Sequence, residues 1–121
     1  MNDMLEVLEP DFIFVDERGS LTQLVHNGYK QVNVITAKAG CFRGGHYHKF
    51  NKEAFYIITG EILLKLRKGE HTAQFSFSNG DMFAISSGVT HGFEFIKDTL
   101  LVSMYDKGVE ISVTEKDIFQ D

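Results

Sequence analysis

Two histidines separated by one residue, inside a frame of regularly spaced glycines, constrain the fold of this chain more than any other feature. The segment from Gly40 to Gly60 reads G-x5-H-x-H-x4-E-x6-G, with His46, His48 and Glu53 at its three polar positions. Side chains alternate between the two faces of a β-strand, so both histidines lie on the same face. A break just after the histidines lets Glu53 begin a second strand that returns opposite them.

A second segment, from Gly80 to Phe95, carries one more histidine. It reads G-x5-S-x-G-x2-H-x3-F and places His91 on a strand that follows a turn at Ser86. Four candidate metal ligands can therefore converge: His46, His48, Glu53 and His91. Three neutral imidazoles and one carboxylate, with open positions left over, suit a divalent ion such as Zn, Fe, Mn, Co or Ni.

Alternation of apolar and polar residues runs through most of the remaining chain and predicts β-strands. The segments with this pattern, or with short apolar runs between turn residues, are 12–15, 21–25, 31–37, 53–59, 61–67, 72–78, 82–85, 91–95 and 100–105. The strand at 31–37 is apolar at most positions, which predicts that both of its faces are largely covered. Residues 1–9 are expected to form a lead-in or an edge strand, and residues 109–119 a final strand followed by a helical turn. About ten short strands with almost no helical periodicity predict an all-β sandwich or barrel.

Length and charge limit what can surround the predicted site. At 121 residues, with 43% apolar side chains and eleven Phe, the chain is expected to form one domain, residues 1–121, with one core. A net charge of −5 argues against nucleic acid or an anionic membrane as the main partner, because binding to phosphates needs a basic surface. Cys41 is the single cysteine, and no window approaches the roughly 20 apolar residues of a membrane helix. The sequence therefore predicts a protein of the reducing cytoplasm.

The two glycine-framed segments, 40–60 and 80–95, resemble the paired motifs of the cupin superfamily. This resemblance implies a double-sheet jelly-roll barrel in which the four candidate ligands hold the metal. The second segment departs from the usual motif at Ser86, where a proline is usual, and at Phe95, where an asparagine is usual. Neither position is a ligand. The turn is therefore expected to be less rigid and the floor of the pocket more apolar, with the metal site retained.

The flanking sequence narrows the resemblance further. The runs DERGSLTQL, GCFRGGHYHK and KEAFYIITGE resemble cupins of bacterial sugar-nucleotide and surface-polysaccharide pathways. The most similar are the C-terminal cupin of capsular-polysaccharide assembling proteins and the small nucleotide-sugar ketoisomerases with RGGHxHK. The metal-free ketoisomerases of this group have no carboxylate at the position of Glu53, so its presence here favours the metal-containing branch.

The resemblance implies an isomerase or epimerase that acts on a nucleotide-linked keto-deoxy sugar in surface-polysaccharide biosynthesis. A divalent cation bound to a keto oxygen and the neighbouring hydroxyl stabilises an enediolate when a proton leaves the adjacent carbon. A general base must then lie within hydrogen-bond reach. The candidate catalytic residues are Tyr105 and Lys49, or one of the histidines if no metal is bound. The candidate substrate-binding residues are Arg43, Lys38 and Phe93.

Two other function classes stay open. A non-catalytic sugar-binding or regulatory cupin would be stabilised by its ligand without turning it over. A metal-dependent oxygenase of a small molecule would require Fe(II) and would consume oxygen.

Self-association is also expected, because a small jelly roll leaves sheet edges and apolar outer faces to cover. Tyr47, Tyr56 and Ile58 are out of phase with the inward-facing residues of their strands. They predict a homodimer formed through these outward faces.

Overall fold

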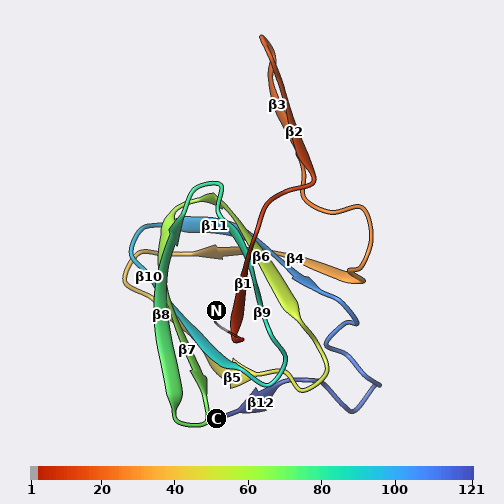
Figure 1. Ribbon diagram of the computed structural model, residues 1–121, viewed down its shortest axis with the longest axis vertical. Coiled ribbons are helices and arrows are strands. Elements are labelled where there is room, and N and C mark those ends of the chain that lie inside the picture. The colour runs from red at the N-terminus through yellow and green to blue at the C-terminus, as the bar shows by residue number, and fades with distance from the viewer. Residues whose placement is uncertain (1–2) are drawn as a thin grey trace.

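The computed structural model describes residues 3–121, which form twelve β-strands and no helix. Ten strands make two antiparallel five-stranded sheets that face each other, and the other two make a separate hairpin (Figure 1). The all-β double-sheet jelly roll predicted from the sequence is thereby confirmed. No helix in this part of the chain has the length and apolar character needed to cross a membrane.

The first sheet has the strand order β1-β9-β6-β11-β4. Its strands are β1 (Leu5–Leu8), β4 (Gln31–Ala37), β6 (Glu53–Thr59), β9 (Met82–Ile85) and β11 (Thr99–Tyr105). The second sheet has the order β12-β5-β10-β7-β8. Its strands are β5 (Phe42–Tyr47), β7 (Glu61–Lys68), β8 (His71–Ser78), β10 (Thr90–Phe95) and β12 (Phe119–Gln120). The chain passes from the second sheet to the first between β5 and β6, so His46 and Glu53 belong to opposing sheets.

Aromatic side chains dominate the core between the sheets. Phe83 stacks on Phe55 of its own sheet, with ring centroids 5.3 Å apart, and on Phe77 of the opposing sheet, at 4.2 Å. Phe93 and Phe95 are buried as well, as the alternation in their strand predicts. The rings of Phe55 and Phe93 also come within 6.4 Å and 6.3 Å of the ring of His91. The apolar core therefore borders the predicted site directly.

The outer face of the first sheet is covered over one half only. There, the segment 24–29 packs against a small apolar cluster that includes Ala54 and Met104. On β4, by contrast, Val32 and Val34 are 61% and 70% exposed. The prediction that this strand is covered on both faces is therefore wrong for the single chain, because no other part of residues 3–121 lies over these two valines.

The hairpin of β2 (Phe12–Asp16) and β3 (Gly19–Gln23) pairs with no other strand of the described chain. Figure 1 shows it at the top of the molecule, projecting away from both sheets. We call this hairpin the arm. Its two strands are close to the predicted segments, but the sequence did not predict that they leave the body of the molecule.

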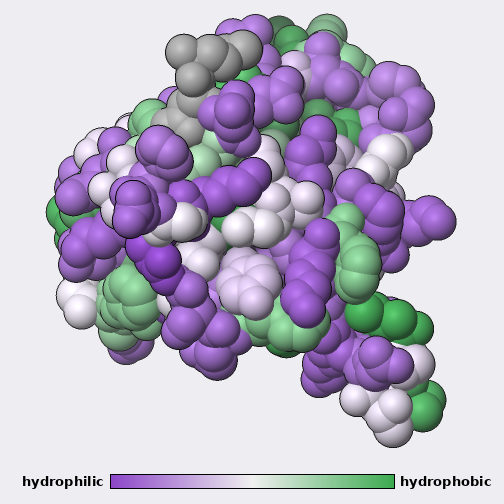
Figure 2. Space-filling model, turned by 60° about the horizontal axis from the view of Figure 1, so that its bottom comes forward, coloured by the Kyte–Doolittle hydropathy of each residue, from purple (hydrophilic) through white to green (hydrophobic). Residues whose placement is uncertain are grey.

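Three residues were predicted to form a dimer surface, and they do not share one face. Tyr56 and Ile58 lie on the outer side of β6 in the first sheet. Tyr47 ends β5 in the second sheet, where its ring stacks on Phe119 at 5.5 Å. Figure 2 shows one face of the molecule as mostly polar, with apolar side chains in small separate patches.

The C-terminal segment contains bends and one isolated bridge, between Glu110 and Lys116, before β12 adds to β5. The predicted order of a strand followed by a helical turn is wrong, because the strand comes last and there is no helical turn in this segment. At the N-terminus an edge strand is confirmed within residues 3–9, since β1 pairs with β9 alone, and residues 1 and 2 lie outside the described residues.

Candidate functional site

Two neighbouring strands of the second sheet bring the three histidines together. His46 of β5 pairs directly with His91 of β10, and the register shifts immediately after this pair. Gly44 makes the close approach of these strands possible: its φ is +115°, and an added Cβ would lie 2.6 Å from the carbonyl oxygen of His91. A residue with a side chain at this position would push the strands apart. The glycines before His46 therefore set the distance between the histidines.

We call His46, His48 and His91 the histidine cluster. The ring centroids are 4.7 Å apart for His46 and His91, 5.2 Å for His46 and His48, and 5.3 Å for His48 and His91. One nitrogen from each ring lies within 4.8 Å of the others. His48 and His91 are buried, whereas His46 is half-buried and faces the cavity described below.

Glu53 reaches the histidine cluster from the opposing sheet. Its Oε1 atom lies 3.0 Å from His48 Nε2 and 3.4 Å from His91 Nε2. On its other side, Ser103 of β11 donates a 2.5 Å hydrogen bond from Oγ to Glu53 Oε2. Glu53 is only 4% exposed, so these contacts replace the water that a carboxylate would otherwise bind.

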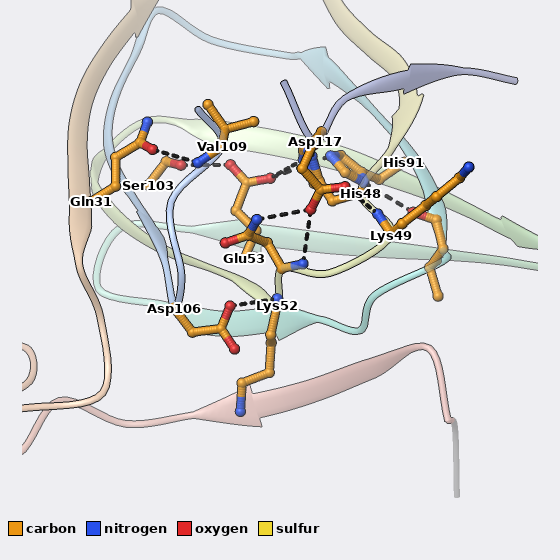
Figure 3. Close-up of polar contacts among 12 residues, drawn as sticks. Gln31, His48, Lys49, Lys52, Glu53, His91, Ser103, Asp106, Val109 and Asp117 are labelled. Atoms are coloured by element: carbon orange, nitrogen blue, oxygen red, sulfur yellow. Dashed lines mark hydrogen bonds and ion pairs between the residues drawn. The ribbon is translucent and has the colours of Figure 1, made fainter. Parts of the chain in front are cut away.

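Backbone carbonyl groups hold the far side of two of the rings. His48 Nδ1 lies 2.6 Å from the carbonyl oxygen of Asp117, and His91 Nδ1 lies 3.1 Å from that of Val89. A carbonyl oxygen only accepts, so each Nδ1 is the hydrogen-bond donor in these contacts. Each Nε2 is then directed at Glu53. Figure 3 shows Asp117 beside His48, at the point where the C-terminal segment crosses the site.

Burial and the neighbouring groups shift the pKa values of the site. Burial, reinforced by the other two histidines, lowers the pKa of His46 to about 4. For His48, burial lowers the pKa, but the hydrogen bonds to Glu53 and Asp117 outweigh it and the net pKa is raised. Burial would raise the pKa of Glu53, yet the contacts with His48 and His91 lower it to about 2. His46 is therefore neutral and Glu53 ionised near neutral pH.

The donor set fits a divalent metal ion. Three imidazole nitrogens lie close enough together for one ion, and an ionised carboxylate oxygen lies beside two of them. A carbonyl oxygen holds Nδ1 of His48 and of His91, so Nε2 is the atom of each ring that would coordinate an ion, the arrangement usual for metal-binding histidines. His48 Nε2 would then give up the proton that it donates to Glu53. The structure thus brings together His46, His48 and His91 as predicted. Glu53 lies beside His48 and His91, but the group of ligand atoms within 4.8 Å of one another contains the three histidines alone.

A cavity of about 460 Å³ lies beside the histidine cluster and is lined by residues of β4, β5, β6, β10 and β11. Its polar lining residues are Asn33, Arg43, His46, Glu53, His91, Ser103 and Tyr105. Its apolar lining residues include Ile35, Phe55, Phe93, Phe95, Leu101 and Ile118. An apolar wall with a few convergent polar groups, at this volume, is typical of a small-molecule site.

The other predicted site residues lie at different distances from the cluster. Arg43 and Phe93 line the cavity, and Tyr105 lines it too, with its ring 5.1 Å from that of His48. Burial and the charge of Glu53 raise the pKa of Tyr105, so its phenol is protonated near neutral pH. Lys38 lies in an adjoining surface hollow that shares Arg43 with the cavity. Lys49 is not brought to the cavity: it is exposed, and its Nζ lies 4.3 Å from the centre of the Phe119 ring.

Two residues of the site were not identified from the sequence. Ser103 follows three apolar residues in β11 and has the same inward phase as Leu101 and Tyr105, a signal that could have been noticed. Asp117 had no such signal. It lies 69 residues from His48, in a segment without strand periodicity.

Solved structures share this fold at low sequence identity. The TDP-quinovose 3,4-ketoisomerase WlaRB of Campylobacter jejuni matches with a TM-score of 0.83 and 16% identity, over 99% of this chain and 95% of that chain. The 3,4-ketoisomerase QdtA of Thermoanaerobacterium thermosaccharolyticum, solved in complex with TDP-4-keto-6-deoxyglucose, matches with a TM-score of 0.81 and 16% identity, over 100% and 90%. Both likenesses establish a shared double-sheet jelly-roll fold.

A longer protein contains a similar unit. The capsular polysaccharide assembling protein CapF of Staphylococcus aureus matches with a TM-score of 0.68 and 22% identity, over 95% of this chain and 32% of that chain. This chain therefore spans about a third of CapF. A comparison with curated proteins finds no significant match.

The sequence also matches a family model, described as the polysaccharide biosynthesis C-terminal domain, over residues 14–111. The matched range runs from the arm through β11 and includes His46, His48, Glu53 and His91. Because it covers most of the chain, the protein belongs to the polysaccharide biosynthesis C-terminal domain family.

Proposed function

We propose that this protein is an isomerase or epimerase acting on a nucleotide-linked 4-keto-6-deoxy sugar in surface-polysaccharide biosynthesis. The observation that carries the proposal is the histidine cluster with ionised Glu53 beside it, facing a cavity of about 460 Å³. Membership of the polysaccharide biosynthesis C-terminal domain family supports a role in polysaccharide biosynthesis. The ketoisomerase QdtA, which is similar in fold, has been solved with TDP-4-keto-6-deoxyglucose, and this supports the class of substrate. The reaction moves a proton from the carbon beside the ketone, through an enediol, to another position on the sugar.

His46, His48 and His91, with Glu53 as a fourth ligand, would hold a divalent metal ion. When bound, such an ion supplies Lewis acidity that stabilises negative charge on the sugar oxygens. Ser103 orients the carboxylate of Glu53 for coordination by donating a hydrogen bond to Oε2. The carbonyl of Asp117 orients the ring of His48.

Proton transfer falls to the residues that line the cavity. Tyr105 has a raised pKa and is therefore a proton donor, which can stabilise an oxygen of the enediol by a hydrogen bond. Where no metal is bound, His46 is neutral near pH 7 and has a free ring nitrogen to accept the proton. Lys49 does not line the cavity, so we assign the base to the cavity residues in its place.

The ligand would extend from the cavity onto the surface. We place the sugar against Phe93 in the cavity and the diphosphate at Arg43, which lines both the cavity and the hollow that contains Lys38. Two cations at this junction match the charge of a diphosphate. The nucleotide would then lie in the hollow. We further propose that the protein works as a homodimer in the cytoplasm, as the sequence predicts.

The test is proton exchange in heavy water. Metal-loaded protein is incubated with a panel of nucleotide-linked 4-keto-6-deoxy sugars, and the ring protons are followed by NMR. We expect deuterium to enter the sugar beside the ketone, and Glu53→Ala to abolish this exchange by removing one ligand. If no sugar takes up deuterium while one of them still raises the melting temperature, the protein is a binding module and the isomerase proposal fails.

A further inference from the structure

Asn33 interrupts the apolar run of β4, between Val32 and Val34. Asn is depleted in strands, because its short amide competes for backbone hydrogen bonds and packs poorly on a pleated surface. Val32 and Val34 are exposed, whereas Asn33 faces the space between the two sheets and lines the cavity beside the histidine cluster. An amide at this inward position does not favour the strand, which directs attention to the cavity.

The amide of Asn33 has no partner among residues 3–121. Gln31, the other inward-facing amide of β4, accepts a hydrogen bond at Oε1 from the backbone N–H of Val109. The side chain of Asn33 makes no such bond within the described chain. No buried side-chain nitrogen or oxygen atom in this part of the molecule lacks a partner, so the polar atoms of Asn33 are open to the cavity. The residue thus offers one acceptor oxygen and two N–H donors to a ligand.

Asn33 lies at one end of a polar row that crosses the inner face of the first sheet. It pairs with Ser103 of β11, and Ser103 donates a hydrogen bond to Glu53 of β6. Two residues farther along the same strands, Ile35 and Leu101 pair with each other and line an apolar part of the cavity. On this sheet, a ligand that extends from the histidine cluster toward β4 therefore meets the amide of Asn33 beside an apolar wall.

The sugar substituent that meets Asn33 follows by elimination, and this step rests on the proposed function. In that function, the keto oxygen on C4 and the neighbouring hydroxyl on C3 lie at the histidine cluster, and the diphosphate on C1 lies at Arg43. The C6 methyl group is apolar and suits the apolar wall. The substituent on C2 is left, and Asn33 is a cavity residue with free polar atoms to which that function gives no role.

We propose that Asn33 is a specificity-determining residue that binds the substituent on C2 of the sugar. This substituent both donates and accepts hydrogen bonds, as a hydroxyl or an acetamido group does, and the amide of Asn33 complements it with its own N–H and carbonyl groups. A sugar without such a group leaves the amide facing the ligand without a partner, which costs affinity. The side chain thus selects among sugars that share the same ketone, methyl group and diphosphate.

The experiment combines a change in the protein with a change in the ligand. Calorimetry measures the affinity of metal-loaded protein for three nucleotide-linked sugars without a ketone, which therefore do not react. They are 6-deoxyglucose, 2-acetamido-2,6-dideoxyglucose and 2,6-dideoxyglucose, and the last lacks the substituent on C2. Wild type is compared with Asn33→Leu, which keeps the size of the side chain, and with Asn33→Val, which suits a strand.

We expect both variants to bind at least one of the two substituted sugars roughly 10-fold more weakly than wild type does, the factor for one or two neutral hydrogen bonds. Both should bind the 2,6-dideoxy sugar as wild type does, because it has no group for the amide to bind. The substituted sugar that shows the larger loss identifies the natural substituent on C2.

Gln74→Leu is the matched control, because it removes an exposed amide from β8, outside the cavity. It should leave all three affinities unchanged. Melting curves and metal content measured by mass spectrometry show that each variant is folded and loaded. A purely structural role of Asn33 would change these two measurements, and it would weaken the three ligands equally.

Equal weakening of all three sugars by Asn33→Leu and Asn33→Val would overturn the proposal, because the lost contact would not be with C2. Unchanged affinities in both variants would overturn it as well, because the amide would then face no group of the ligand. If none of the three sugars binds, the class of ligand is wrong, and the proposed function fails together with this inference. A loss confined to the substituted sugars, in a protein that exchanges no deuterium into any 4-keto sugar, would keep the role of Asn33 and remove the isomerase.

Discussion

Glu53 is a buried carboxylate whose charge is balanced by contacts inside the molecule. Its Oε1 atom faces His48 and His91, and its Oε2 atom accepts a hydrogen bond from Ser103. A buried ionised carboxylate without such partners costs several kcal/mol. The orientation of Glu53 therefore depends on its neighbours in β11 as much as on the histidines.

Replacing Ser103 with Ala tests this dependence. The substitution leaves Glu53 Oε2 buried without its donor, so it should raise the pKa of Glu53 and lower the free energy of unfolding by about 1–3 kcal/mol. Ser76→Ala, on the exposed side of β8, is the control and should change stability by less than about 0.5 kcal/mol. Urea denaturation at pH 7 measures both variants. Equal midpoints for the two would contradict the structural role assigned to Ser103.

The pH dependence of metal-free protein should report the state of His46. Its pKa is about 4 in the folded protein, against an ordinary value of 6.5. Because the unfolded chain binds the proton more readily, stability should fall as the pH drops from about 6.5 to about 4. Glu53, with a folded pKa of about 2, adds a further loss as the pH falls below its ordinary value of 4.5. His48 acts in the opposite sense, since its raised pKa stabilises the fold at low pH and this contribution is lost as the pH rises.

His46→Gln isolates the first of these effects. We expect the variant to lose the decline in stability between pH 6.5 and pH 4. In the wild type this decline should have a slope of less than about 1 kcal/mol per pH unit, because solvent screens the charge of a half-buried ring. The exposed residue His71 provides the control His71→Gln, which should keep the wild-type profile. Melting temperatures measured after chelation give both profiles. The same slope in wild type and His46→Gln would assign the acid sensitivity to another group.

Among the elements, the C-terminal segment before β12 holds the loop after the histidines in place through Asp117. The carboxylate of Asp117 accepts hydrogen bonds from the backbone N–H groups of Lys49, Phe50 and Asn51 and from the side chain of Asn51. The backbone carbonyl of Asp117 meanwhile holds His48. One buried residue thus fixes both the loop and a ring of the cluster, as Figure 3 shows.

Asp117→Asn should weaken the hydrogen bonds between Asp117 and the loop, because an amide offers one acceptor oxygen where the carboxylate offers two. We expect the free energy of unfolding to fall by about 2–3 kcal/mol, the range for a buried charged group that loses hydrogen bonds. Metal affinity should weaken roughly 10- to 100-fold, as is usual when a partner that orients a ligand is disturbed. Glu115→Gln, exposed in the same segment, is the control for the change in charge. Unchanged metal affinity in Asp117→Asn would limit its role to the loop.

The elements also show what the sequence could predict and why. Strands such as β4, β6 and β9 match their predicted bounds because period-two patterns and glycine turns are local signals. The contacts of Asp117 with His48 and the loop could not be predicted, since the tertiary fold alone brings Asp117 to His48. The direction of Lys49 could not be fixed either, because the chain leaves β5 before this residue and strand alternation no longer applies; a solvent-exposed position was one of its two interpretations. The arm was predicted as two strands, but apolar residues on both faces do not reveal whether the covering surface belongs to the same chain.

At the scale of the whole molecule, the site joins the two sheets. His46 and His91 belong to the second sheet and His48 directly follows it, whereas Glu53 belongs to the first. An ion held by all four residues would tie the two sheets together beside the cavity. The metal should therefore stabilise the entire fold and not only the local loop.

Chelation is the last test, and it measures this global effect. An ion at a hundredfold excess over its Kd stabilises the folded state by about 2.7 kcal/mol. For a chain of this size, its removal should lower the melting temperature by roughly 5–15 °C. Glu53→Ala and His91→Ala should melt at temperatures that chelator does not change, because each lacks a ligand. His71→Ala, which removes an exposed histidine outside the cluster, should respond to chelator as the wild type does. Mass spectrometry measures the metal content of the wild-type protein before and after chelation. If the ion is removed and the melting temperature does not change, the ion does not join the sheets.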